Sequence, residues 1–274
     1  MKRFWLIVRK VLLALICACV VVLFGITLAS AIDKKTQERC QAIHIKIDTE
    51  SGLAFINEDE IRERINLLSG GNVVGKQISD IDLRTLEKEI RKNPYVKNAE
   101  VYVDRLQHLW VQIIQKRPII RVMNKDGVGY YISELNDRMP LSDKFTLRLI
   151  IALGNVQINE HRRDSIVQNV LFDLVNYIRR DVFLHALVDQ IEVVHEDDIN
   201  LIPRSSGHVI YFGNPRENMA EKFERLKTFY RVGLTRVGWY RYKSINLKYR
   251  GQVVCERSDT TTVPVGEASP LAPQ

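Results

Sequence analysis

The stretch closest to a catalytic motif is a glycine-rich run that ends in lysine, from Gly70 to Lys76. It reads GGNVVGK and fits the first seven positions of a phosphate-binding P-loop, in which backbone N–H groups and the lysine bind phosphates. The eighth position is Gln77, where a P-loop has the Ser or Thr that holds magnesium, and the pattern before the run is helical. We therefore expect a turn between two helices, with nucleotide binding as the alternative.

The other residues that could do chemistry do not form a known catalytic or metal-binding pattern. No two of the six histidines lie four residues apart, as a pair of zinc ligands on one helix face would. Glu196, Asp197 and Asp198 are expected to form a solvated loop, with a metal or acid/base cluster as the alternative. The chain has neither a Gly-x-Ser-x-Gly elbow nor a Ser-x-x-Lys pair. These features predict a protein that is not an enzyme and that needs no cofactor or metal.

An uncharged segment near the N-terminus predicts a membrane anchor. It runs from Val11 to Ile32, and at a helical rise of about 1.5 Å per residue it can cross a hydrocarbon core about 30 Å thick. Every charged residue before it is cationic, whereas charges of both signs follow it. Residues 1–10 should therefore be a cytoplasmic stub and the rest should be exported. A cleaved signal peptide is the alternative, because Ala29-Ser30-Ala31 matches a cleavage pattern. The exported side has no ATP supply, which further disfavours a nucleotide site.

The composition limits what the exported part can do. About 240 of the 274 residues follow the anchor, enough for two small domains with hydrophobic cores. The formal net charge is +7, but several cationic residues belong to the cytoplasmic stub, so nucleic-acid binding is not indicated. Cys17 and Cys19 lie in the predicted anchor, which leaves Cys40 and Cys255 as a disulfide pair that no sequence pattern supports.

Residues 42–118, after a polar stalk at 33–41, carry the pattern of a first small domain. Residues 42–47 alternate apolar and polar, as in a half-buried strand. Asn57 and Glu60 form a capping box before a helix that ends at Gly70-Gly71, and a second helix is expected to begin near Ser79 or Asp80. Two strands joined as a hairpin complete the domain. The expected order is strand, helix, helix, strand, strand, over residues 42–47, 57–70, 79–93, 99–104 and 109–114.

Residues 119–257 are expected to form a second mixed domain with an antiparallel-rich sheet. Its first boundary is at residues 116–118, where two charged residues precede a proline. The last strand, residues 244–250, alternates Ile245, Leu247 and Tyr249 with polar residues, as in an antiparallel strand with one wet face. Residues 258–274 read as a disordered tail. The other expected strands are 119–123, 128–132, 147–153, 190–194 and 208–212, and helices are expected around 166–178 and from Pro215 to about 231. The fold class is therefore α+β.

One short stretch carries a more specific resemblance. Residues 93–101 read NPYVKNAEV, and with residues 111–113 and 116–118 they resemble a POTRA domain. Together with the cytoplasmic stub, the single anchor and the terminal run at 245–249, the arrangement is similar to the FtsQ/DivIB family of bacterial cell-division proteins. The POTRA motif positions are Pro94, Tyr95, Val96, Ala99 and Val101.

The resemblance implies a non-catalytic scaffold of the divisome, held in the inner membrane, with its bulk in the periplasm and enriched at the septum. It implies FtsB-like and FtsL-like partners, and other septal cell-wall synthesis proteins, with strand addition to a C-terminal edge strand at residues 244–253. The alternative is that this strand is only a member of the sheet. The residues implied in partner binding form one run, namely Ile245, Asn246, Leu247, Lys248, Tyr249, Arg250, Gly251, Gln252 and Val253.

The chain departs from the family at two points. The first is the hairpin turn, where the family commonly has an aromatic residue followed by proline and this chain has Arg105-Leu106-Gln107-His108. At the second, the family usually has Asp-Leu-Arg where this chain has Asn246-Leu247-Lys248, so the detailed partner contacts can differ. The strand at residues 96–103 is a second candidate for a docking edge.

Three other functions stay open. They are a POTRA-containing outer-membrane assembly or secretion factor, a membrane-anchored cell-wall enzyme and a signalling ectodomain.

Overall fold

The computed structural model describes residues 18–24, 38–48, 52–156, 166–205, 207–238 and 240–258. They form two compact units that divide between Lys116 and Arg117, two residues before the expected boundary. Residues 18–24 are helical, but most of the predicted anchor, with Val11 and Ile32, lies outside the described residues, as do the stub and residues 259–274. No helix in the described ranges is long and apolar enough to span a membrane.

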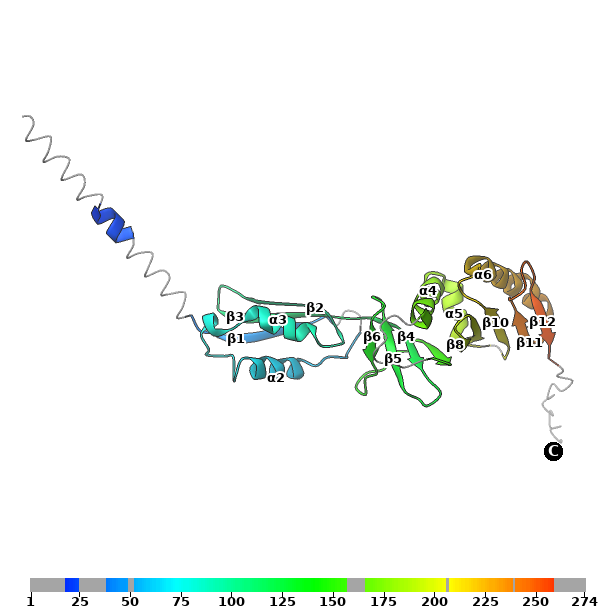
Figure 1. The fold of residues 1–274 in the computed structure, drawn as a ribbon, viewed down its shortest axis with the longest axis horizontal. Helices are drawn as coiled ribbons and strands as arrows, with labels where there is room; N and C mark the ends of the chain where they lie inside the picture. The colour runs from blue at the N-terminus through cyan, green and yellow to red at the C-terminus, as the bar shows by residue number, and fades with distance from the viewer. Residues whose placement is uncertain are drawn as a thin grey trace, which may run out of the picture. The chain divides into compact units, whose positions relative to one another are not determined.

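Unit 1 is a three-stranded sheet with two helices (Figure 1). The strand order is β1-β3-β2, with β1 parallel and β2 antiparallel to β3. The Asn57 side chain accepts a hydrogen bond from the N–H of Asp59, which confirms the predicted start of the first helix. The elements are β1 Ala42–Ile47, α2 Glu58–Leu68, the 3₁₀ turn Ile78–Asp80, α3 Leu83–Arg91, β2 Val96–Val103 and β3 His108–Gln115. Their order is the one that the sequence predicts.

The second helix of unit 1 starts later than predicted. The Asp82 carboxylate accepts a hydrogen bond from the N–H of Thr85 at 3.0 Å and so caps α3. The expected start near Ser79 or Asp80 is wrong, because Ile78–Asp80 form a separate 3₁₀ turn before this cap.

The core of unit 1 lies between one face of its sheet and the two helices. Strand registers such as Ile45 opposite Val111, and Val111 opposite Val101, place alternate residues of all three strands on one face. The buried members of this face and of the helices are Ile43, Ile45, Ala99, Val101, Leu109, Val111, Ile113, Ile61, Ile65, Leu86 and Ile90. Polar and aromatic residues occupy the opposite face, as the period-2 pattern predicts.

Unit 2 is a nine-stranded sheet in the order β12-β11-β10-β9-β8-β7-β4-β5-β6. Five of its eight neighbouring pairs are antiparallel, so the sheet is mixed and rich in antiparallel pairs. The strands are β4 Pro118–Met123, β5 Gly129–Ser133, β6 Arg138–Pro140, β7 Ile150–Gly154, β8 Val188–His195, β9 Asp198–Pro203, β10 Val209–Gly213, β11 Tyr242–Asn246 and β12 Val254–Arg257.

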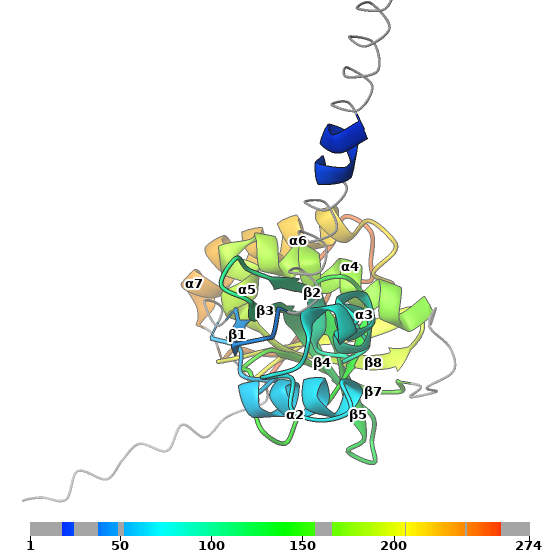
Figure 2. The same cartoon turned by 90° about the vertical axis from the view of Figure 1, so that its left-hand side faces the viewer.

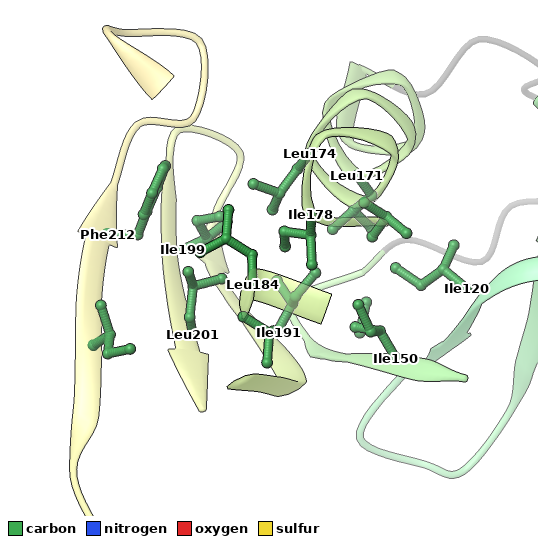
Figure 3. Close-up of a cluster of buried hydrophobic side chains, with 14 of the residues drawn as sticks. Ile120, Ile150, Leu171, Leu174, Ile178, Leu184, Ile191, Ile199, Leu201 and Phe212 are labelled. Atoms are coloured by element: carbon green, nitrogen blue, oxygen red, sulfur yellow. The ribbon is translucent and has the colours of Figure 1, made fainter. Parts of the chain in front are cut away.

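Three helices, α4, α5 and α6, lie on the same side of the unit 2 sheet (Figures 1 and 2). Leu171, Leu174 and Ile178 of α4 point toward apolar side chains of the strands (Figure 3). Each such leucine or isoleucine stabilises the fold by about 1.5–3 kcal/mol through burial. The helices are α4 Ile166–Arg180, α5 Val182–Leu187 and α6 Met219–Thr228, and α6 continues through the π-helical turn Phe229–Leu234 into α7 Thr235–Val237.

Two elements of unit 2 escape the sequence pattern. The strand β9 was not predicted, because Ile199, Asn200 and Leu201 are all buried and the period-2 alternation is lost. Its partner β8 is joined to it through Glu196 and Asp197, so the acidic run forms a hairpin turn and the first residue of β9. The short helix α5 and the three-residue strand β6 were also missed.

The last long helix begins four residues after the proline that was expected to open it. Arg216 donates its backbone N–H to the Asn214 side chain, which makes a turn at Pro215. Asn218 then adopts a left-handed conformation with φ of 51° directly before Met219. The turn and this backbone reversal delay the start of α6.

Candidate functional site

The C-terminal end of the unit 2 sheet differs from its sequence prediction. The predicted edge strand over residues 244–253 is wrong, because β11 ends at Asn246 and lies between β10 and β12. β11 pairs in parallel with β10 and antiparallel with β12. The outermost strand is therefore Val254–Arg257, and residues 247–253 form the turn that leads to it.

Local chemistry explains why the chain turns after β11. The Asn246 side chain accepts a hydrogen bond from the N–H of Lys248 at 2.9 Å, which bends the backbone away from the strand. Gly251 has φ of 69°, a conformation that strains a residue with a Cβ atom. The same residues that resemble a partner-binding strand thus encode a reversal, and the glycine was the available signal.

The nine residues of the predicted partner-binding run fall into three groups by burial. Ile245 and Leu247 are fully buried in the core of unit 2, and the N–H of Leu247 donates to the carbonyl of Tyr211. Asn246 and Val253 are half-buried. The exposed members are Lys248, Tyr249, Arg250, Gly251 and Gln252. Only the exposed group can contact a partner without disturbing the core.

An arginine on α6, which no sequence pattern indicated, holds the turn between β11 and β12. The guanidinium of Arg225 in α6 donates to the backbone carbonyls of Tyr249 at 2.6 Å and Gln252 at 2.9 Å. It also donates to the carbonyl of Leu247 at 3.3 Å. Its carboxylate neighbour is Glu221, one helical turn away at 3.9 Å. No sequence pattern links Arg225 to residues that follow it by more than twenty positions.

A second tie joins the turn to the middle of the sheet. The ammonium of Lys248 lies 2.7 Å from a carboxylate oxygen of Asp198, the first residue of β9. Its aliphatic stem packs on Gly213, where an added Cβ would lie 2.9 Å from the Lys248 Cγ. Because both side chains are partly exposed, at 39% and 28%, the ion pair contributes no more than about 1 kcal/mol. Lys248 is thus engaged within the chain.

The helix that carries Arg225 is itself anchored to α5. Lys227 lies 2.6 Å from Glu224 and 2.9 Å from Asp181, and these hydrogen bonds raise the pKa of the Lys227 ammonium. The hydrogen bond from Lys227 in turn lowers the pKa of the Asp181 carboxyl. Asp181 also caps α5 by accepting the N–H of Leu184. These ion pairs join α6 to α5, while the buried Phe223 and Leu226 pack α6 on the core.

The outermost strand has mostly exposed side chains. Val254 and Glu256 point to solvent, and the Lys243 ammonium lies 3.4 Å from the Glu256 carboxylate. Cys255, on the other face, packs against the core, and burial raises the pKa of its thiol. None of the four residues is a proline, so each has a backbone N–H.

The glycine-rich run of unit 1 forms the predicted turn between helices. The Lys76 ammonium donates to the carbonyl of Ser69 at the end of α2, which directs the lysine back into the turn. Gly70, Gly71 and Gly75 all have positive φ values, which supports a tight turn. In the part of the chain that the structure describes, no three His, Cys, Asp or Glu side chains come together as a metal site.

The POTRA motif positions serve the structure of unit 1. Pro94 lies in the turn between α3 and β2, and the Tyr95 ring stacks on Phe55 with ring centres 5.2 Å apart. Val96, Ala99 and Val101 are buried on β2, which is an outer strand of its sheet. Arg91 of α3 donates two hydrogen bonds to the carbonyl of Ala99, so part of the β2 backbone is engaged by a helix.

Comparison with known proteins follows the same division of the chain. Residues 117–256, just over half of the chain, match the sequence model of a family described as FtsQ/DivIB, C-terminal related. Residues 38–114 match that of the POTRA-like domain. No curated protein sequence matches the chain. From residue 38 onward, the two matches cover nearly all the described residues of unit 1 and unit 2.

Proposed function

The chain belongs to the FtsQ/DivIB family, and from this premise we propose that it is a non-catalytic scaffold of the bacterial divisome. The family assignment supports a role in cell division. The proposed scaffold docks FtsB-like and FtsL-like proteins and links them to other septal cell-wall synthesis proteins. It performs no chemistry, in keeping with a sequence that has no catalytic pattern.

The observation that carries the docking proposal is the exposed outer strand β12. An outer strand offers backbone N–H and C=O groups to an extended segment of another protein, which adds as a further strand. In this proposal the added strand pairs with Val254–Arg257. The predicted run at 245–253 does not itself pair with the partner strand. Its buried part supports β12 from the core side, and its exposed part borders the docking edge.

Specificity in this proposal comes from side chains beside the outer strand. Tyr249 is 56% exposed and Val254 is 44% exposed, large fractions for residues of their type. Tyrosine provides a rigid contact area at a small entropic cost, and for this reason it is common among residues that dominate interfaces. We assign Tyr249 as the aromatic contact for the partner.

The proposed scaffold is anchored by Val11 to Ile32 in the inner membrane, with units 1 and 2 in the periplasm. The uncharged run and its cationic N-terminal flank support this topology. Detection of the intact N-terminus in the membrane fraction tests the anchor. Release of a chain that begins after Ala31 would contradict it.

A fluorescent fusion tests the division role most directly. We expect midcell enrichment of the fusion and filamentous cells when the protein is depleted. Uniform distribution around the envelope, with normal division after depletion, would contradict the proposed role.

A pair of tyrosine variants tests the docking surface. Tyr249→Glu places a charge beside the proposed interface, and we expect affinity for the co-expressed FtsB-like protein to fall by at least about tenfold, or about 1.4 kcal/mol. Tyr240→Glu is the matched control, since Tyr240 is 75% exposed and belongs to the same unit. Co-purification of the full-length chains measures both. Equal binding of the two variants would argue against the docking surface.

A further inference from the structure

Arg225 makes an unusual set of contacts for a helix residue. Its guanidinium donates to three backbone carbonyls of one turn, those of Leu247, Tyr249 and Gln252. It does so from α6, 22 to 27 residues earlier in the sequence. The side chain is only 16% exposed, so these bonds are poorly replaced by water.

The geometry of the guanidinium suits this task. It is planar, carries five N–H donors in a fixed arrangement and stays charged at all ordinary pH values. Three carbonyl oxygens that converge on one point repel one another unless a cation lies between them. A lysine offers a single charged nitrogen and cannot reach three separated oxygens equally well.

The turn that Arg225 holds is also the only covalent route from β11 to β12. β12 has four residues and pairs with β11 alone among the described strands. A strand this short contributes little pairing energy of its own, so its position depends on the turn before it. The tie between Lys248 and Asp198 fixes the same turn at its other side.

We infer that Arg225 is a positioning residue for the docking edge, holding the β11–β12 turn so that β12 is ordered before a partner strand arrives. The inference rests on the proposed function in one respect, that β12 is the strand to which the partner adds. Arg225 itself does not contact the partner. Without it, the partner must order the turn and β12 as it binds, and the entropic cost of that ordering lowers the affinity.

Three variants of the full-length chain test the inference. Arg225→Met keeps the length and the apolar stem but removes all donors, and Arg225→Lys keeps the charge. Arg216→Met is the matched control, because Arg216 is also in unit 2, is 49% exposed and has its ion-pair partner, Asp197, outside the turn.

Hydrogen exchange of the free chain is the first measurement. In Arg225→Met we expect the amides of β12 to exchange at least about tenfold faster, with amides of α4 and β8 unchanged. Arg225→Lys should fall between this variant and the parent chain, and Arg216→Met should match the parent chain. Unchanged exchange in β12 of Arg225→Met overturns the inference.

Thiol labelling gives a second measurement that does not depend on a partner. In a chain with Cys17, Cys19 and Cys40 replaced by serine, iodoacetamide reports on Cys255 in β12 alone. Because this thiol is partly buried with a raised pKa, we expect slow labelling in the parent chain and faster labelling in Arg225→Met. Equal labelling rates in the two chains overturn the inference.

Affinity for the co-expressed FtsB-like protein separates the inference from the proposed function. Weaker binding of Arg225→Met together with faster exchange in β12 supports both. If the β12 amides of Arg225→Met exchange at the parent rate while Tyr249→Glu still binds the partner weakly, only the inference is overturned. Faster exchange in β12 with unchanged affinity overturns the docking edge, and with it the role of Arg225 in docking.

Discussion

The two ends of the nine-stranded sheet in unit 2 are built differently. At one end, β6 has three residues, of which the last is Pro140, and proline has no N–H to offer a further strand. At the other end, β12 has four residues and no proline. A sheet has two outer strands, and proteins shield those that should stay unpaired by making them short or by adding proline.

Side chains reinforce the shielding of the β6 end. Gln168 of α4 is 2% exposed, accepts a hydrogen bond from Arg138 at 2.7 Å and donates to the carbonyl of Asn136 at 2.6 Å. The Arg138 guanidinium also lies over the Tyr130 ring, 4.5 Å from its centre. At the β12 end the corresponding side chains are exposed, at 71% and 57% for Lys243 and Glu256. The difference indicates that one end closes the sheet and the other remains available for pairing.

Substituting a proline into β12, as at the end of β6, should have the largest effect on partner binding. Successive N–H groups of a strand point to opposite sides, so Cys255→Pro and Glu256→Pro together test both directions. One of these prolines replaces a residue whose N–H points away from β11. That variant should leave the free energy of unfolding unchanged and lower partner affinity by at least about tenfold, because one hydrogen bond of the added strand is lost. The other proline should detach β12 from β11. Affinity and hydrogen exchange distinguish the two.

The reverse change at the β6 end is the control. Pro140→Ala restores an N–H there, and we expect no change in affinity for the partner. If both proline variants of β12 bind normally, or if Pro140→Ala alters binding, the contrast between the two ends is wrong.

Removing the Gln168 side-chain amide should have the next largest effect, on stability rather than binding. Gln168→Leu leaves the carbonyl of Asn136 and the guanidinium of Arg138, both partly buried, with one partner fewer. We expect a loss of about 1–3 kcal/mol in the free energy of unfolding, measured with urea. Asn169→Ala, one residue along on the exposed side of α4, should cost less. Weaker partner binding by Gln168→Leu would show that the two ends are coupled.

Acidification should affect the β12 end slightly more than the β6 end. The pKa of Asp181 is lowered by its hydrogen bond from Lys227. Its contribution to folding stability is therefore complete above the ordinary aspartate pKa, and it is lost as the pH falls through the lower pKa of the folded state. Glu224 also pairs with Lys227. The amides at the β6 end do not titrate. In thermal unfolding by circular dichroism, Asp181→Asn should reduce the drop in midpoint between pH 7 and pH 3 by about 1–2 °C. An identical drop would exclude this ion pair as the cause.

Elements defined by contacts along the chain were predictable. Asn57 marks the start of α2 because a cap acts on residues two or three positions away. The wide apolar stripe of α4 and the alternation in β1 depend only on the repeat of each element. The turn before Gln77, the residue that does not fit a P-loop, was likewise predictable, because its conformation depends on glycines within it.

Elements defined by distant contacts were not predictable in the same way. The strand β9 shows no alternation because residues on both of its faces are buried, Ile199 and Leu201 in the core and Asn200 on the other face, where it donates a hydrogen bond to Glu192. The run at 245–253, which the resemblance predicts to bind a partner, has the period of one strand up to Tyr249. The core nevertheless accepts only Ile245 and Leu247, and the chain then reverses. Arg225 carries no sequence signal, because its partners are backbone carbonyls.

The sequence by itself determined the two-domain division, the order of elements in unit 1 and the family resemblance, since these depend on local periodicity, caps and short motifs. Only the tertiary structure decided that β12 is the outer strand and that Arg225 holds the turn before it. Both depend on which segments meet in space, such as β10 beside β11 and α6 beside residues 247–252. Those pairings follow from the packing of the whole unit, which no local pattern contains.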